Sequence, residues 1–229
     1  MIKIVDTYSG NRLELDKWKA EGYVGVIFKA GQGEWPDVPR VHPDWWGLAK
    51  EAGFRRGWYW LADSRYHSSN HIKAMQTHGI LADTGELGLW IDVEKPVIAW
   101  TEAQYFATKY HGYKNVQDIV YLCTQNGVKP GIYTGPGAYE LVTRDAPQSA
   151  HDYFALFDLW TAQYPYIYTE GVSKPKLFGA WKDWTWWQFR EGPDVSNFNG
   201  TEEQFLVKYP NIPNARGKMT IGNKLYEES

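Results

Sequence analysis

The sequence predicts an α/β fold: a single-domain, incomplete TIM-like (β/α)5β3 barrel. Short runs of β-branched and aromatic residues recur at intervals too long for hairpins, and helix-like stretches separate the early ones. After residue 134 the runs come closer together, which indicates strands joined by irregular links. A barrel of this type commonly occupies a chain of 229 residues as one domain. We therefore expect one barrel and one core.

The expected strands are read from the runs in chain order. The five βα strands are KIVD at 3–6, VGVIFKA at 24–30, RGWYWLA at 56–62, LGLWIDVE at 87–94 and GIYT at 131–134. The last three strands are DLWTAQY at 158–164, WTWWQF at 184–189 and DVSNF at 194–198. The final two runs are too close for a helical crossover. Residues 1–208 form the expected domain, and the polar, aperiodic stretch 209–229 is expected to be a C-terminal tail or the start of a linker.

Helix boundaries are marked by capping and stop residues. Asp44 is expected to cap the helix DWWGLAKEAG, which ends at Gly53. Thr101 and Gln104 form a capping box that opens TEAQYFATKYHG. The helix NVQDIVYLCTQNG is expected to end at Gly127.

Two acidic residues lie at the end of the fourth strand run. The two-residue period of a strand places Asp92 and Glu94 on the face of Trp90 and sends Ile91 and Val93 to the other face. Active sites of α/β barrels lie at the C-terminal ends of the strands, which is where this pair is expected. Solvated acids at a strand end are the alternative, but apolar residues flank Asp92 on both sides. We therefore expect the pair to carry chemistry.

Two further acids belong to the first and last strands. Asp6 ends the first run and Asp194 opens the last, and these strands are neighbours in a closed barrel. Four acids are thus expected around one mouth. Neighbouring carboxylates cannot both ionise cheaply, so one should keep its proton near neutral pH. A glycosidic oxygen needs such a proton in order to leave.

Composition limits the classes of partner. Aromatic residues reach 17%, with 13 Trp and 16 Tyr, which indicates a core built from large rings, a sugar-binding cleft, or both. A formal net charge of −3 without a basic run argues against a nucleic-acid partner. No apolar run is long enough for a signal peptide or a membrane span. We expect synthesis in the cytoplasm, no membrane insertion, and delivery by another factor if the substrate lies outside.

Three other features are expected to be structural. His67 and His71 have the spacing of helical metal ligands, but no Glu stands between them, and Ser68 or Ser69 resembles a helix cap that would leave His67 outside the helix. We expect no metal and a solvated or substrate-edge role for these histidines. Cys123, in an apolar stretch, is expected to be a buried thiol. In WTWWQF, Trp186 and Trp187 should face opposite ways.

Eight motifs along the chain resemble glycoside hydrolase family 25, the lysozymes often found in phages and bacteria. They are IVD, VIFKAGQG, GWYW, LWIDVEKP, KPGIYT, LWTAQYP, WWQF and DVSNFNG, in the family's order and spacing over residues 3–200. The resemblance implies a (β/α)5β3 barrel and hydrolysis of the β-1,4 bond from N-acetylmuramic acid to N-acetylglucosamine in bacterial peptidoglycan. It implies no cofactor.

The resemblance also implies roles for single residues. Glu94 matches the general acid, Asp92 the acid that stabilises the transition state or orients the substrate's 2-acetamido group, and Asp6 and Asp194 the acids of the outer strands. The side chains expected to bind substrate are Tyr59, Trp60, Tyr133, Gln163 and Trp187.

Three positions depart from the family pattern. The first motif continues Asp6-Thr7-Tyr8 rather than Asp-Val-Ser, and the second ends Gly31-Gln32-Gly33 rather than Thr-Glu-Gly. Ser196 stands where the family favours Asn. These changes leave the four acids in place and bear on substrate preference at the cleft rim.

Two alternative functions stay open. One is hydrolysis of another N-acetylated glycan such as chitin, and the other is wall binding without turnover. A phage endolysin released by a holin, a bacterial enzyme and a catalytic domain of a longer protein all fit the sequence, and it does not indicate an oligomeric state.

Overall fold

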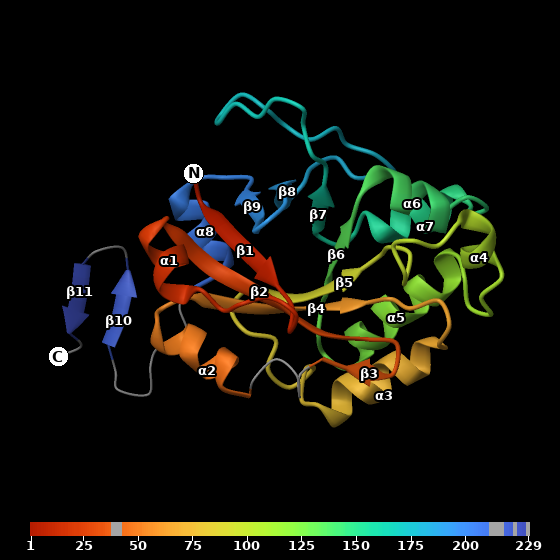
Figure 1. Ribbon diagram of the computed structural model, residues 1–229, viewed down its shortest axis with the longest axis horizontal. Coiled ribbons are helices and arrows are strands. Elements are labelled where there is room, and N and C mark those ends of the chain that lie inside the picture. Colours follow the sequence, from red (N-terminus) through yellow and green to blue (C-terminus); the bar gives the residue numbers. More distant parts are fainter. Residues whose placement is uncertain (38–42, 211–217, 222–223, 228–229) are drawn as a thin grey trace.

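Eight strands close into a barrel in the computed structural model, which describes residues 1–37, 43–210, 218–221 and 224–227 (Figure 1). In order around the barrel they are β1 (Lys3–Thr7), β2 (Tyr23–Gln32), β4 (Arg55–Leu61), β5 (Gly88–Asp92), β6 (Gly131–Thr134), β7 (Leu159–Ala162), β8 (Trp186–Arg190) and β9 (Asp194–Phe198). Neighbouring strands from β1 to β8 run parallel, and β9 closes the barrel antiparallel to both β8 and β1. The expected (β/α)5β3 fold is confirmed.

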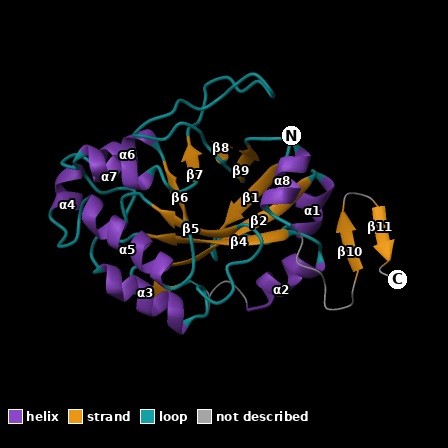
Figure 2. Ribbon diagram, turned by 180° about the vertical axis from the view of Figure 1, so that it is seen from behind, coloured by secondary structure: helices purple, strands orange, loops and turns teal. Residues whose placement is uncertain are grey.

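Helices lie on the outside of this barrel (Figures 1 and 2). They are α1 (Leu15–Ala20), α2 (Pro43–Glu51), α3 (Ser68–Thr77), α4 (Glu102–Phe106), α5 (Tyr113–Gln125), α6 (Pro136–Val142), α7 (Gln148–Phe154) and α8 (Glu202–Lys208). A short strand, β3 (Trp35–Pro36), pairs with the end of β2. The long link from β7 to β8 projects from the barrel as an irregular loop (Figure 1). No helix among the described residues is long and apolar enough to span a membrane.

Alternation along the strands divides the apolar residues into two cores. Residues that point inward, such as Ile4, Ile27 and Trp160, fill the barrel. Phe205 of α8 packs against the end of the barrel where the parallel strands begin. Residues that point outward, such as Phe28, pack under the helices. Because the interior is filled below the strand ends, the barrel is a packed core and not a pore.

Most of the expected helix signals operate as predicted. Gly53 and Gly127 follow the ends of α2 and α5 with φ of +83° and +80°, values that a glycine adopts without a steric penalty. The capping box of Thr101 and Gln104 opens α4. The cap expected at Asp44 is wrong: α2 already begins at Pro43, so Asp44 lies in the first turn, where a negative charge faces the positive end of the helix dipole.

Two further boundaries differ from expectation. The helix expected from Thr101 to Gly112 ends at Phe106, because the chain turns after one and a half turns of α4 to lead into α5. Tyr209, one residue past the expected end of the domain at 208, is buried: its hydroxyl accepts from Trp186 Nε1 (3.1 Å) and its carbonyl accepts from Arg55 Nε (2.7 Å). Beyond it, β10 (Lys218–Ile221) and β11 (Lys224–Glu227) form an antiparallel hairpin where an aperiodic tail was expected.

Candidate active site

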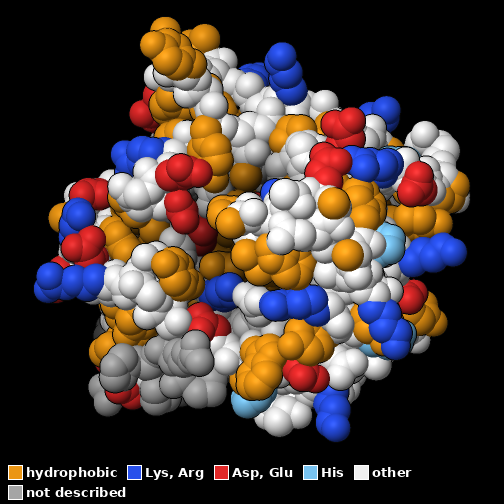
Figure 3. All heavy atoms as spheres, turned by 45° about the vertical axis from the view of Figure 1, so that its right-hand side comes forward, with side chains coloured by type: hydrophobic (Ala, Val, Ile, Leu, Met, Phe, Trp, Pro, Cys, Tyr) orange, Lys and Arg blue, Asp and Glu red, His pale blue; other side chains and the backbone are white. Residues whose placement is uncertain are grey.

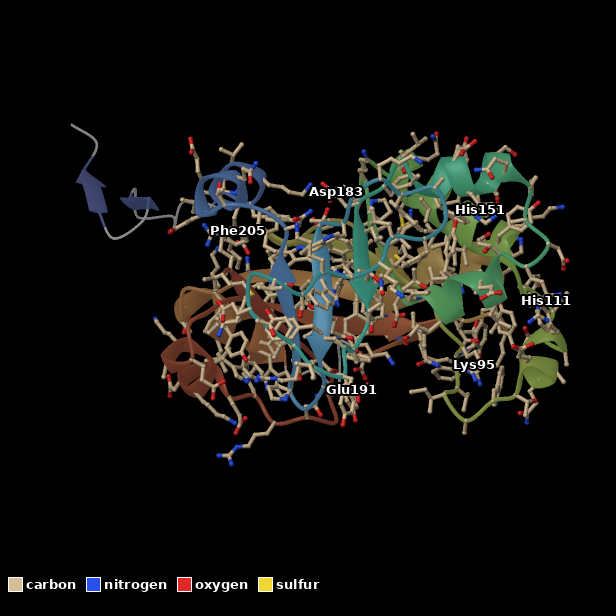
Figure 4. All side chains as sticks on the ribbon, turned by 90° about the horizontal axis from the view of Figure 1, so that it is seen from above. Lys95, His111, His151, Asp183, Glu191 and Phe205 are labelled. Atoms are coloured by element: carbon tan, nitrogen blue, oxygen red, sulfur yellow. The ribbon has the colours of Figure 1, made fainter. Side chains whose placement is uncertain are left out.

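A cavity of about 600 Å³ opens at the C-terminal ends of the barrel strands. Figure 3 shows acidic side chains running into the hollowed middle of this face. In Figure 4 the cavity residues Lys95 and Glu191 lie on the side of the barrel opposite Phe205 of α8. The polar and aromatic residues of the lining are Asp6, Tyr8, Lys29, Gln32, Tyr59, Asp92, Glu94, Lys95, Tyr133, Trp160, Tyr164, Gln188, Glu191 and Asp194.

Asp92 and Glu94 reach the cavity from the same face of one strand, as expected. Asp92 is the last residue of β5 and is 5% exposed. The strand geometry continues beyond it, because the backbone N–H of Val93 donates to the Tyr133 carbonyl (2.8 Å). Val93 points into the outer core with Ile91, so Glu94 returns to the cavity side.

Asp6 and Asp194 meet across the seam that closes the barrel. They are direct partners in the antiparallel register of β1 and β9, and both line the cavity. The four acids expected around one mouth therefore do share a single cavity.

The four carboxyl groups all hold their protons more tightly than ordinary acids do. The pKa values of Asp92 and Asp6 are raised well above the usual range, chiefly by burial and then by the charges of Glu94 and Asp194 respectively. Burial also raises the pKa of Glu94 and of Asp194. The ammonium of Lys29 opposes the rise for Asp92 and Glu94. Burial, and not the charge of the neighbouring Asp92, is therefore the main cause of the raised pKa of Glu94.

One oxygen of Asp92 has no hydrogen-bond partner among the residues that the structure describes. Its Oδ1 atom is buried and receives no hydrogen bond from the described residues. A buried carboxylate oxygen left in this way costs free energy, and an N–H or O–H donor in the cavity removes that cost. The cavity is thus suited to a ligand that brings a donor to Asp92.

Lys29 also lines the cavity, and the sequence analysis did not identify it. A series of hydrogen-bonded side chains holds its ammonium group in place. Its Nζ donates to Gln32 Oε1 (3.1 Å), and Gln32 Nε2 donates to Asp63 Oδ2 (3.2 Å). Asp63 is fully buried and is held by the guanidinium of Arg65. Strand alternation could have identified Lys29. Ile27 points into the barrel, and a residue two positions further along a strand points the same way.

Gln188 is a second residue that the sequence analysis missed. It is 1% exposed on β8, and its Nε2 donates to Asp6 Oδ1 (2.8 Å). Its Oε1 accepts from the hydroxyls of Tyr133 (2.8 Å) and Tyr164. Strand alternation could have identified Gln188 as well, because Trp186, two positions earlier on β8, points into the barrel.

The five side chains expected to bind substrate divide into two groups. Tyr59 and Tyr133 line the cavity. Trp60, Gln163 and Trp187 do not.

Trp60 is fully buried in the outer core because its position on β4 alternates with that of Tyr59. Trp187 is 1% exposed and donates to the Gln163 carbonyl (2.7 Å). The Gln163 amide holds the loop after β7 through the Lys176 carbonyl (2.8 Å). As expected, Trp186 and Trp187 face opposite ways: Trp186 lies in the inner core and Trp187 packs against Tyr168 outside it.

The histidines correct a further expectation. His67 is itself the cap of α3, accepting from the Ser69 backbone, in place of a serine cap. His71 is fully buried rather than solvated: its Nδ1 accepts from Trp60 Nε1 (3.0 Å), and burial lowers its pKa to about 4. Within the described part of the chain, no group of three or more His, Cys, Asp and Glu residues could hold a metal ion. Cys123 is buried as expected, which raises the pKa of its thiol to about 12.

Solved structures share this fold along nearly the whole chain. A family 25 lysozyme from Aspergillus fumigatus is 22% identical with a TM-score of 0.68, over 92% of this chain and 99% of that one. A muramidase from Trichobolus zukalii is 20% identical with a TM-score of 0.68, over 91% and 99%. A lysozyme from Streptomyces coelicolor is 18% identical with a TM-score of 0.66, over 91% and 96%. No curated protein matches the chain by sequence.

The family model for glycosyl hydrolases family 25 matches residues 5–198. That range runs from β1 to the end of β9 and includes all five acids that line the cavity. The chain therefore belongs to glycosyl hydrolase family 25.

Proposed function

We propose that this chain is a lysozyme that hydrolyses the β-1,4 bond between N-acetylmuramic acid and N-acetylglucosamine in bacterial peptidoglycan. Family membership supports glycoside hydrolysis, and the structural neighbours are lysozymes and muramidases by name. The observation that carries the proposal is the pair formed by Glu94, whose pKa is raised by burial, and Asp92, whose buried Oδ1 has no donor in the described protein.

Glu94 acts as the general acid in this account. Its carboxyl proton passes to the glycosidic oxygen as the bond to the anomeric carbon breaks, and the leaving sugar departs as an alcohol. Glu94, now ionised, then takes a proton from the water that attacks the anomeric carbon. The second step restores the acid and completes the hydrolysis without a cofactor.

Asp92 acts on the charge that develops at the anomeric carbon. Its Oδ1 either stabilises that charge directly or accepts the N–H of the substrate's 2-acetamido group, whose oxygen then attacks the anomeric carbon in place of a protein nucleophile. The second route matches the unpartnered oxygen of Asp92, since an acetamido N–H is the donor that this atom lacks. Asp6 and Asp194 add negative potential from the closing strands.

The experiment is clearing of a purified cell-wall suspension, followed by borohydride reduction and mass analysis of the new reducing ends. Reduced muramic acid ends support the proposal. Glucosamine ends, or cleavage of chitin oligomers at a comparable rate, would assign the enzyme to another N-acetylated glycan. Binding to walls without any released ends would mean that the chain is a wall-binding protein.

A further inference from the structure

Gln188 lies at the point where three strands bring polar groups together. It is almost completely buried, and both ends of its amide are used: Nε2 donates to Asp6 on β1, and Oε1 accepts from Tyr133 on β6 and from Tyr164 after β7. Because β8 is antiparallel to β9, Gln188 pairs with Ser196 and stands beside the strand that carries Asp194.

The structure gives the orientation of the amide directly. Its NH₂ group faces Asp6, since Nε2 donates to Asp6 Oδ1 (2.8 Å), and this hydrogen bond favours the carboxylate form of Asp6 while burial opposes it. The amide oxygen then faces both tyrosines, whose hydroxyl groups donate to it. With the amide reversed, its oxygen would face the Asp6 oxygen at hydrogen-bond distance, and the two acceptors would repel unless Asp6 were protonated.

This arrangement determines the polarity of the cavity wall. Each tyrosine has one hydroxyl proton, and Tyr133 and Tyr164 both donate it to Gln188 Oε1. Toward the cavity these hydroxyls are left with lone pairs only, as is the carboxylate of Asp6. The wall therefore offers acceptors to a ligand, which suits the hydroxyl and N–H groups of an N-acetylated sugar.

We propose that Gln188 is the positioning residue of this site: its amide donates a hydrogen bond that favours the carboxylate form of Asp6, and it turns the hydroxyls of Tyr133 and Tyr164 into acceptors for sugar donors. The proposal rests on the proposed glycoside hydrolysis and deepens it by assigning the polarity of one wall of the cleft. Gln188 acts through Asp6 and the tyrosines rather than on the reacting bond.

Asp6 is surrounded by titratable groups from several elements. Asp194 on β9 and Glu94 after β5 raise its pKa, and the hydrogen bond from Gln188 lowers it. Its own charge raises the pKa of Asp92, Tyr59, Tyr133 and Tyr164, and the cation Lys29 lines the same cavity. Among these neighbours, the side chain that donates a hydrogen bond to Asp6 is that of Gln188.

Two substitutions separate the donor function from simple packing. Gln188→Met removes both the donor and the acceptor. Asp6 then protonates at higher pH, so activity relative to wild type should fall about tenfold near neutral pH and fall further as the pH is lowered. Gln188→Glu keeps an acceptor for the tyrosines and can share one proton with Asp6, which replaces the amide N–H at acidic pH. Its activity relative to wild type should therefore rise as the pH is lowered.

The measurement is kcat and KM for release of reducing ends from cell walls between about pH 4 and pH 8, with the melting temperature of each variant. Asn115→Leu is the control, because it also removes a buried amide, whose Nδ2 donates to the Tyr66 carbonyl (3.0 Å) outside the cavity. It should lower the melting temperature and leave the pH profile unchanged.

Opposite pH trends for the two Gln188 variants support the proposal. Parallel pH profiles with the wild-type shape, whatever the melting temperatures, would overturn it and leave Gln188 a packing residue. The result is separable from the proposed function, since the pH trend is read on whichever glycosidic bond is cleaved. A fully active Glu94→Gln variant would reject the general acid while leaving the Gln188 comparison intact.

Discussion

Asp6 and Asp194 are direct partners across β1 and β9, and the antiparallel direction of β9 is what brings them together. In a parallel strand the first residue lies at the end of the barrel remote from the cavity. Because β9 runs the other way, its first residue reaches the C-terminal end of β1. The charge of Asp194 then raises the pKa of Asp6, second only to burial. Closing the barrel thus adds two acids to Asp92, the last residue of β5, and Glu94, which follows that strand.

Replacing either member of this pair with Asn should lower turnover more than stability. Asp6→Asn and Asp194→Asn each weaken the negative potential that favours an oxocarbenium-like transition state, so kcat should fall about tenfold or more. The melting temperature should stay constant or rise at neutral pH, because a buried like charge is removed. Specific activity and melting temperature are measured on the same samples.

The matched control is Asp158→Asn. Asp158 precedes β7 at the other end of the barrel and pairs with Lys208 at the surface (2.7 Å). It should change neither quantity much. If Asp6→Asn or Asp194→Asn instead melts far lower and keeps wild-type specific activity per folded molecule, that acid has a structural role only.

Asp92→Asn should abolish most activity and stabilise the fold at neutral pH. The pKa of Asp92 is raised in the folded protein, so its contribution to stability is present below its unfolded pKa of about 4 and is lost as the pH rises through the folded value. The variant avoids that loss. Its melting temperature should exceed that of wild type by a few degrees at pH 7, and the gap should close toward about pH 4. A variant that melts lower than wild type at pH 7 would show that the native fold stabilises the carboxylate.

Lys29→Met should move the whole pH profile of activity toward higher pH. The ammonium of Lys29 lowers the pKa of both Asp92 and Glu94, so its loss raises both values. If both carboxyls titrate in the profile, both of its limbs should move to higher pH. Lys114→Met, which changes an exposed lysine on α5, is the control. Unchanged limbs in Lys29→Met would exclude Lys29 from the electrostatics of the site.

The barrel and its acids could be predicted because two simple patterns determine them. The spacing of the strand runs identifies the βα units, and the period of two places Asp92 and Glu94 on the cavity side. The approach of Asp6 to Asp194 followed from closure alone, since the first and last strands of a barrel must meet. These inferences need only the chain order and the geometry of one strand.

Other features depend on neighbours that the sequence does not specify. Trp60 and Tyr59 are adjacent aromatic residues, and only the register of β4 decides which of them faces the cavity. Trp187 donates to the carbonyl of Gln163, which begins the irregular loop after β7. The sequence of that loop has no periodic pattern from which its path could be predicted. His67 accepts from the Ser69 backbone as a cap of α3, a role in which serine is the more common residue. The Gln188 contacts join strands far apart in sequence.

The most direct test of the account is the rate of wall clearing by Glu94→Gln. Glutamine preserves the shape of the side chain and removes the proton that the leaving oxygen needs. General acid catalysis commonly contributes about 10²–10⁴-fold, so we predict a loss of that order with the wild-type melting temperature retained. A folded Glu94→Gln protein that clears walls at more than half the wild-type rate would contradict the assignment of Glu94 as the general acid.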